Sequence, residues 1–245
     1  MIRQILFLVV VFFFVTGKSN FAQSNDAQPL LPFSKTEVAE IRDIIGGDLL
    51  LGKTADATNV LNKIEKYDII HLATHATVNE RAPLSSKFLF YNNTKLFLSD
   101  IYSLNLKAKM AVLSSCNTGR GKLEKGEGII SFARAFKFAG CSSIIMSLWS
   151  IDDISTAAIM KNFYSELKRN RPKDVALRLA KLKYLSQSNS KTAAPVFWAA
   201  TVPVGNLKSL NINIEKKETD IWGYLLAAFV LLAIPASYYI KQKRT

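Results

Sequence analysis

Asp68-Ile-Ile-His-Leu-Ala-Thr-His75 is a short apolar run of strand length that ends in a histidine. A second run, Lys109-Met-Ala-Val-Leu-Ser-Ser115, is almost continuously apolar and ends just before Cys116. Unbroken apolar runs of this length are typical of strands that are buried on both faces of a parallel sheet. The two runs therefore predict two inner strands of such a sheet.

Helical and strand-like patterns alternate through the middle of the chain. Ser34 to Glu37 has the spacing of a capping box, and Gly46-Gly47 ends the helix that it begins. The alternation predicts an α/β fold with a mainly parallel sheet and helices on both faces. Further patterns predict helices at 56–66, 129–139, 153–168 and 173–186, and strands at 48–51, 87–91, 142–148 and 196–202.

Both long apolar runs lead into a residue that can take part in nucleophilic catalysis. In an open parallel sheet, ligands collect at the carboxyl ends of the strands. If the two strands are neighbours, the His75 imidazole can withdraw the thiol proton of Cys116, and the thiolate can attack a carbonyl carbon. Caspases place their histidine about fifty residues before the cysteine, and here the separation is 41. The spacing alone does not establish the dyad, because any chain with two histidines and two cysteines offers some such pair.

Five stretches, in the order of a known family, carry a more specific resemblance. They are His-Leu-Ala-Thr-His-Ala (71–76), Val-Leu-Ser-Ser-Cys-Asn-Thr-Gly (112–119), Gly-Glu-Gly-Ile-Ile-Ser-Phe-Ala-Arg-Ala-Phe (126–136), Ser-Leu-Trp-Ser-Ile-Asp-Asp (147–153) and Phe-Trp-Ala-Ala (197–200). Through them the chain resembles the CHAT domain, a relative of caspases and separase. The resemblance implies a caspase-like domain over residues 30–206.

The resemblance also implies roles for individual residues. By position, His75 would be the general base and Cys116 the nucleophile. The backbone N–H groups of Cys116 and Ala76 would stabilise the oxyanion, since developing charge needs preorganised donors. The family usually has glycine where this chain has Ala76, and alanine lacks the freedom of glycine at positive φ.

Two further groups of polar residues have a functional and a purely structural interpretation. His71 lies on the same strand face as His75 and could support the site, or it could be a hydrogen-bonded core histidine. By similarity with separase, Asp153 or its neighbour Asp152 could bind a basic P1 side chain of a substrate. The same aspartates could instead cap the helix that begins there.

Other kinds of chemistry find little support in the sequence. Cys141 opens an apolar strand and reads as a buried small hydrophobe, although a disulfide with Cys116 is conceivable in an oxidising compartment. The glycine-rich segment 119–128 lacks the Lys-Ser/Thr of a phosphate loop, and no metal-ligand spacing or cofactor motif is present.

The formal net charge of +13 suits an anionic partner, but without a basic stripe interleaved with aromatic residues it does not indicate nucleic acid.

The first residues have the pattern of a secretory signal. The apolar run Ile5 to Val15 follows Arg3 and precedes small residues, which predicts a signal peptide over residues 1–23 with cleavage near Ala22 or Gln23. At 1.5 Å per residue this run is too short to cross a bilayer as a helix. We therefore expect cleavage rather than anchoring.

The last residues have the pattern of a membrane anchor. A polar linker at 207–219 precedes an apolar segment at 220–240, in which Asp220 is followed by twenty uncharged residues, and the tail 241–245 is basic. The segment is long enough to span a bilayer, and the basic tail predicts a cytoplasmic C-terminus. The domain between signal and anchor would then lie on the extracytoplasmic side.

Two classes of function are compatible with these features. The first is a membrane-tethered cysteine endopeptidase that cleaves protein substrates, after a basic residue by similarity with separase. The second is a catalytically inactive CHAT-fold binding or signalling module. CHAT domains usually follow helical repeats that recruit partners, and no such repeats are found here, so a partner protein could supply recognition. Retention of both His75 and Cys116 favours the first class.

Overall fold

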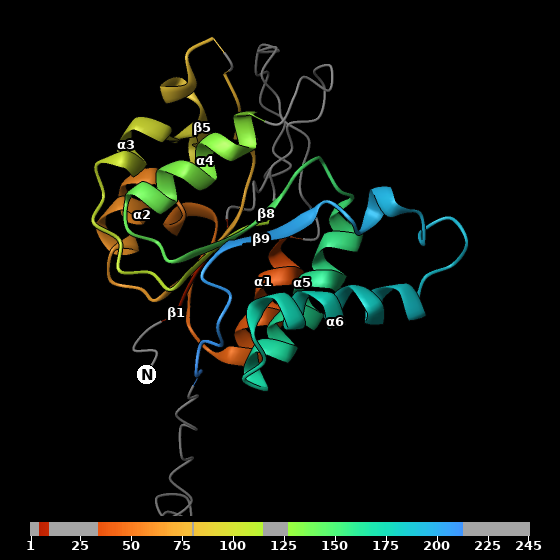
Figure 1. Ribbon diagram of the computed structural model, residues 1–245. Helices are drawn as coiled ribbons and strands as arrows, with labels where there is room; N and C mark the ends of the chain where they lie inside the picture. Colours follow the sequence, from red (N-terminus) through yellow and green to blue (C-terminus); the bar gives the residue numbers. More distant parts are fainter. Residues whose placement is uncertain (1–4, 10–33, 80, 115–126, 213–245) are drawn as a thin grey trace, which may run out of the picture. The chain divides into compact units, whose positions relative to one another are not determined.

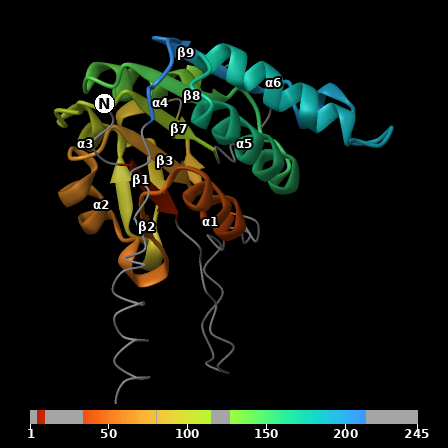
Figure 2. The same ribbon diagram turned by 90° about the horizontal axis from the view of Figure 1, so that it is seen from below.

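A six-stranded sheet forms the centre of the molecule in the computed structural model, which describes residues 5–9, 34–79, 81–114 and 127–212. The strand order is β2-β1-β3-β7-β8-β9, and all neighbours are parallel except β8 and β9. Figure 1 and Figure 2 show this sheet between two layers of helices. The strands are β1 (Ile5–Val9), β2 (Asp48–Leu50), β3 (Ile69–Ala73), β7 (Met110–Leu113), β8 (Ser143–Ser147) and β9 (Thr201–Gly205).

Helices cover both faces of the sheet, as the alternating pattern predicts. One face carries α1 (Ser34–Ile45), α5 (Asp153–Lys168) and α6 (Lys173–Ser186), and the other carries α2 (Ala57–Ile64), α3 (Leu98–Tyr102) and α4 (Glu127–Phe138). Side chains alternate between the two layers along each inner strand, because successive residues of a strand point to opposite faces. On β3, for example, Ile69 packs with the α1, α5 and α6 layer, and Ile70 packs with the other layer. The predicted α/β class is therefore confirmed.

The segment Ile5–Val9 forms a strand inside this sheet. It pairs in parallel with β2, where Phe7 lies opposite Leu49, and with β3, where Phe7 lies opposite His71. These five residues fall within the stretch for which the sequence predicts a signal peptide. Cleavage near Ala22 or Gln23 would remove β1 and separate β2 from β3, so the two interpretations cannot both hold for one mature chain.

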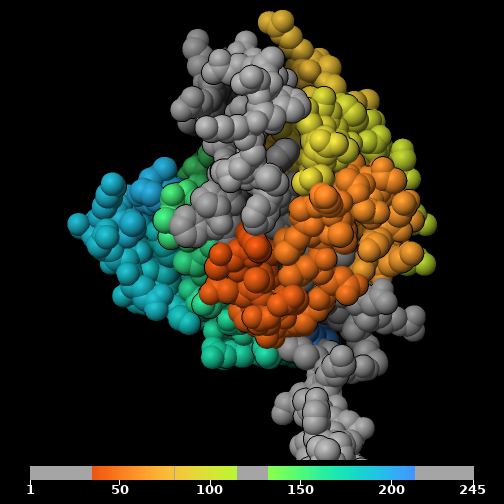
Figure 3. Space-filling model, turned by 180° about the vertical axis from the view of Figure 1, so that it is seen from behind, coloured from red at the N-terminus to blue at the C-terminus, as the bar shows by residue number. Residues whose placement is uncertain are grey.

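A small antiparallel sheet is inserted between β3 and β7. Its order is β4 (Ala76–Thr77), β5 (Lys87–Leu89) and β6 (Lys95–Phe97). Of these strands, only β5 falls within a predicted strand, and all three are too short to show a clear periodic pattern. Figure 3 shows this part of the chain, in yellow, at one end of the surface beyond the orange residues that include α2.

The last strand differs from its prediction. The sequence predicts a strand at 196–202, but the structure has a short 3₁₀ turn at Pro195–Phe197 and starts β9 at Thr201. Proline favours the first position of a helical turn and cannot donate to a strand ladder. The turn is held by Trp149, whose Nε1 donates to the carbonyl of Val196 at 3.1 Å.

Two lysines of α6 connect this helix to β9 and to the residues that follow it. Lys173 Nζ donates to the carbonyls of Asn206 at 2.9 Å and Lys208 at 2.8 Å. Lys181 Nζ donates to the carbonyl of Thr201 at 2.7 Å. Burial lowers the pKa of Lys173 to about 8. These contacts fix the chain up to the beginning of the predicted linker.

Within the described ranges, no helix combines the length and the apolar character that a membrane span requires. The predicted span at 220–240, the tail 241–245 and the linker beyond residue 212 lie outside the described residues. Cys116, the predicted nucleophile, also lies outside the described residues.

Candidate active site

His75 lies at the carboxyl edge of the parallel sheet, two residues beyond the end of β3. Its side chain is buried, and its carbonyl accepts a hydrogen bond from the N–H of Leu89 at 2.9 Å. The hydroxyl of the preceding Thr74 donates to the carbonyl of Leu89. The chain on either side of His75 is thus attached to β5 of the small sheet, which sets where the histidine leaves β3.

The strand that leads to Cys116 is the neighbour of β3. Strands β3 and β7 pair in parallel from Ile69 opposite Met110 to Leu72 opposite Leu113. The N–H of Ser114 then donates to the carbonyl of Leu72 at 3.0 Å, which extends the ladder by one residue. The structure therefore confirms that the two strands are neighbours, and its description stops two residues before Cys116.

Ala76 is compatible with a donor role for its backbone. It lies opposite Phe88 in an antiparallel pair, and the hydrogen bond from Leu89 to His75 flanks that pair. This pattern makes the pair a non-hydrogen-bonded one, so the N–H of Ala76 points away from β5. The φ angle of Ala76 is not positive. Alanine in place of the usual glycine therefore introduces no backbone strain at this position.

Asp152 and Asp153 have different environments. Asp152 is the N-cap of α5, and its carboxylate accepts from the N–H of Ser155 at 3.2 Å. This confirms the capping interpretation for Asp152. Asp153 lies in the first turn of the same helix and is partly buried. Burial, together with the negative charges of Asp152 and Glu37, raises the pKa of Asp153 from 3.8 to about 6.

Of the two aspartates, Asp153 is the better candidate for binding a cation, because Asp152 makes the capping hydrogen bonds. The capping contacts of α5 are made by Asp152, and no hydrogen bond from the described residues reaches the carboxylate of Asp153. A partly buried carboxylate with a raised pKa is typical of functional sites, although structural networks can also produce one.

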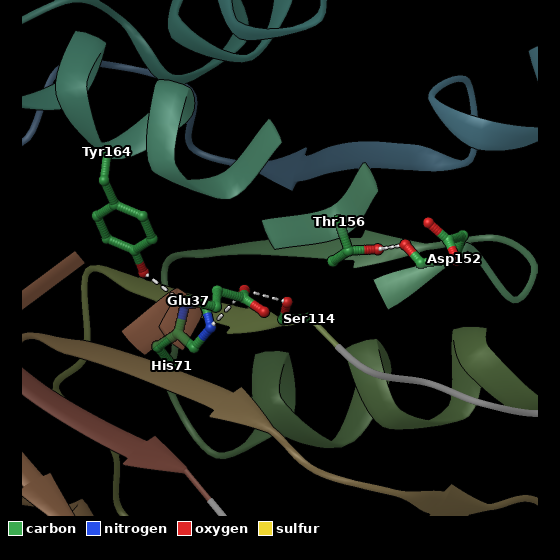
Figure 4. A network of polar contacts seen from close by, with 6 residues as sticks. All are labelled: Glu37, His71, Ser114, Asp152, Thr156 and Tyr164. Atoms are coloured by element: carbon green, nitrogen blue, oxygen red, sulfur yellow. Dashed lines mark hydrogen bonds and ion pairs between the residues drawn. The ribbon is translucent and has the colours of Figure 1, made fainter. Parts of the chain in front are cut away.

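His71 is part of a buried polar network rather than an isolated core residue. Its Nε2 lies 3.1 Å from Glu37 Oε1, and its Nδ1 lies 3.0 Å from the hydroxyl of Tyr164. Ser114 also donates to Glu37 Oε1. Figure 4 shows these four side chains converging from α1, β3, β7 and α5. The sequence did not assign Glu37, Ser114 or Tyr164 to the site.

Cys141 is a free, buried cysteine two residues before the first residue of β8. Its Sγ contacts the carbonyl of Ser143 at 3.2 Å, and burial raises the pKa of its thiol to about 11. Such a thiol is almost entirely protonated at neutral pH and is a poor nucleophile. The interpretation of Cys141 as a small hydrophobe is confirmed. Among the described side chains, no group of three or more His, Cys, Asp or Glu residues is placed to hold a metal ion.

The family model of the CHAT domain matches residues 4–206 of this sequence. The chain belongs to the CHAT domain family. The match covers most of the chain and includes the residues of β1, so it begins earlier than the predicted domain start at residue 30.

Two tetratricopeptide repeat proteins are similar to this CHAT chain at low sequence identity. Human tetratricopeptide repeat protein 28 is 24% identical over 218 residues, covering 74% of this chain and 9% of that protein. The mouse protein of the same name is 23% identical over the same shares. The chain thus corresponds to less than a tenth of the length of these relatives.

Among solved structures, the Arg-specific cysteine proteinase gingipain R has a TM-score of 0.51 at 9% identity, covering 85% of this chain and 48% of that one. The separase–securin complex of Saccharomyces cerevisiae gives a TM-score of 0.47 at 11% identity, over 83% of this chain and 12% of that one. The likeness to gingipain R is one of fold.

Proposed function

We propose that this CHAT domain is a cysteine endopeptidase whose catalytic dyad is His75 and Cys116. The observation that carries the proposal is the register of β3 and β7. Partners in these strands are 41 residues apart, as in Ile69 with Met110 and Leu72 with Leu113, and His75 and Cys116 are separated by the same 41 residues. Adjacent strands lie about 4.8 Å apart. His75 and Cys116 thus each lie three residues beyond the last pair of the ladder, Leu72 and Leu113.

The proposed dyad would catalyse acyl transfer. The imidazole of His75 takes the proton of the Cys116 thiol, and the thiolate attacks the scissile carbonyl carbon. The N–H groups of Ala76 and Cys116 stabilise the oxyanion, and the imidazolium then protonates the leaving amine. Water hydrolyses the resulting thioester, with His75 as the base. The orientation of the Ala76 N–H away from β5 supports this role.

We also propose that Asp153 binds a basic P1 side chain of the substrate. Its carboxylate lies beyond the end of β8, at the same edge of the sheet as His75. No hydrogen bond from the described residues occupies it. An arginine-specific proteinase with the same fold supports a preference for basic residues.

Labelling of the full chain with an acyloxymethyl ketone that carries Arg or Lys at P1 tests the dyad directly. We expect mass mapping to find the label on Cys116 and not on Cys141, because an activated thiolate reacts and a buried thiol does not. The His75→Ala variant should lose the label. The Cys141→Ala variant, which removes the other thiol of the chain, should label as the wild type does.

Two results would contradict the dyad. One is equal labelling of Cys116 in wild type and His75→Ala. The other is a folded protein that reacts with no member of a probe set covering basic, acidic and apolar P1 residues. The second result would favour the alternative function, a binding or signalling module that has kept the CHAT fold without activity.

We further propose that residues 220–240 tether the domain to a membrane. The support is the sequence alone: the run from Ile221 to Ile240 has no charged residue and is long enough to span a bilayer, and the basic tail 241–245 follows it. The chain should stay in the membrane pellet after extraction at alkaline pH, and a chain that ends at residue 212 should not. Release of the full chain into the supernatant would rule out a span.

The side of the membrane depends on the first residues. Export with cleavage of residues 1–23 would place the domain outside the cytoplasm, as the basic tail also predicts. Cleavage would remove β1 from the sheet. Localisation therefore depends on whether the mature protein retains this strand.

A further inference from the structure

The carboxylate of Glu37 connects the two strands that lead to the proposed dyad. Its Oε1 accepts a hydrogen bond from Ser114, at the end of β7, and lies 3.1 Å from Nε2 of His71, on β3. His71 is four residues before His75, and Ser114 is two residues before Cys116. One side chain of α1 thus contacts both strands close to the edge where the proposed chemistry takes place (Figure 4).

The four side chains of this network, Glu37, His71, Ser114 and Tyr164, are all buried, with 6% exposure or less. Buried charged groups contribute little net stability compared with apolar residues of similar volume, because removal from water offsets the gain of pairing. The surrounding layer is built from apolar residues such as Ile41, Ile69 and Val112. A contribution to stability therefore does not explain why a carboxylate and an imidazole are present in this apolar layer.

The network also orients the ring of His71. Nε2 of the ring lies 3.1 Å from Glu37 Oε1, at the distance of an ion pair. On the opposite side of the ring, Nδ1 is 3.0 Å from the hydroxyl of Tyr164. Contacts from α1 and α5 thus hold the ring on both sides, and the ring in turn holds β3.

We propose that Glu37 is a positioning residue that, through His71 and Ser114, holds the ends of β3 and β7 against α1 and so fixes the direction in which the chain continues to His75 and Cys116. This inference rests on the proposed function. The backbone ladder sets the separation of the two strands, and the contacts of Glu37 hold the strand ends relative to α1. Such positioning matters because a displacement of about 1 Å at a reacting pair can reduce the rate roughly 100-fold.

The test compares kcat and KM of Glu37 variants with those of a matched control on the same helix. Glu40 lies one turn further along α1 and also connects α1 to α5, since it accepts from Lys161 Nζ at 2.7 Å. We expect Glu37→Leu to lower kcat roughly 100-fold, with KM within about twofold of the wild type, because positioning acts on the chemical step. Glu40→Leu should leave both constants unchanged.

Two milder variants keep the test decisive if Glu37→Leu does not fold. Glu37→Gln retains an acceptor for Ser114 and should lose less activity than the leucine variant. Ser114→Ala removes a single hydroxyl and should lower kcat about tenfold. When Glu37→Gln and Ser114→Ala are combined, their effects on kcat should be non-additive, because both changes act on the contact between Ser114 and Glu37. Near-UV circular dichroism at the assay temperature confirms that each variant is folded.

The outcomes separate this inference from the proposed dyad. If the wild type cleaves and labels at Cys116 while folded Glu37→Gln and Ser114→Ala variants keep the wild-type kcat, the dyad stands and the positioning role is overturned. If loss of activity only follows loss of folded protein, the network is structural. An inactive, unlabelled wild type would overturn the dyad and the positioning role together.

Discussion

The Asp153→Asn variant should cleave after arginine roughly 10- to 100-fold less efficiently than the wild type at pH 8, while cleavage after leucine stays unchanged. A hydrogen bond between charged groups contributes about 1.5–3 kcal/mol, and each 1.4 kcal/mol corresponds to about a factor of ten. The measurement is kcat/KM for paired peptides that differ only in the P1 residue. Their ratio isolates Asp153, because the titration of the dyad affects both peptides alike.

The same ratio should depend on pH in the wild type. The pKa of Asp153 is raised to about 6, mainly by burial. Above this pH the carboxylate is charged and attracts a basic P1 side chain, and below it the carboxyl is neutral and the attraction is lost. The preference for arginine should therefore fall as the pH decreases from 8 to 5, and Asp153→Asn should remove this dependence.

Asp152→Asn is the control for this prediction. Asp152 caps α5, so the change should lower the free energy of unfolding by up to about 1 kcal/mol without changing the arginine-to-leucine ratio. A role of Asp153 in P1 binding would be contradicted if its asparagine variant kept the wild-type ratio at pH 8. It would also be contradicted if both aspartate variants changed the ratio equally.

The sequence predicts the centre of the fold well because its strands are buried on both faces. The apolar runs that end at His75 and just before Cys116 correspond to β3 and β7, and the structure pairs these strands as neighbours. The helices of the middle segment show their apolar stripes and also lie close to their predicted bounds. Periodicity is informative here because burial determines which residues each element can carry.

The sequence did not reveal the buried network, because its residues also fit other common patterns, such as a capping box or an apolar helix stripe. Glu37 has the spacing of a capping-box residue, but the structure uses its Oε1 to contact His71 and Ser114. One signal could have revealed it: Glu37 lies one turn before Ile41, beside the apolar stripe of α1. Tyr164 gives no such signal, since a tyrosine in an apolar stripe is common in cores.

The sequence pattern of the N-terminal segment does not distinguish a signal peptide from an inner strand. A run of eleven apolar residues after a basic residue satisfies the rules for a signal peptide, and part of it equally satisfies those for an inner strand. Local composition cannot separate the two, because both require continuous apolar side chains. The pairing partners of the segment, β2 and β3, are specified elsewhere in the chain.

A chain that starts at residue 24 should not form the stable domain if β1 is part of the mature protein. Removing β1 breaks the backbone pairing on both of its sides, with β2 and with β3. Each lost hydrogen bond contributes roughly 1 kcal/mol, and a domain of this size has only about 5–15 kcal/mol of net stability. Thermal unfolding of the shortened and full chains measures the effect, and mass analysis of the N-terminus of the expressed protein shows whether residues 1–23 are retained.

A pair of proline variants separates the strand from the signal within the same apolar run. Phe7→Pro places a proline in β1, opposite Leu49 and His71, where it removes a ladder donor. Phe13→Pro makes the same change in the part of the run that lies outside the described residues. If the segment is a strand, Phe7→Pro should lower the melting temperature more than Phe13→Pro does, because Phe7 lies within the described pairing of β1. If it is the apolar core of a cleaved signal, both prolines should impair export, and any exported protein should begin near residue 24 and unfold at the wild-type temperature. That second pattern would mean that the sheet of the mature domain forms without β1.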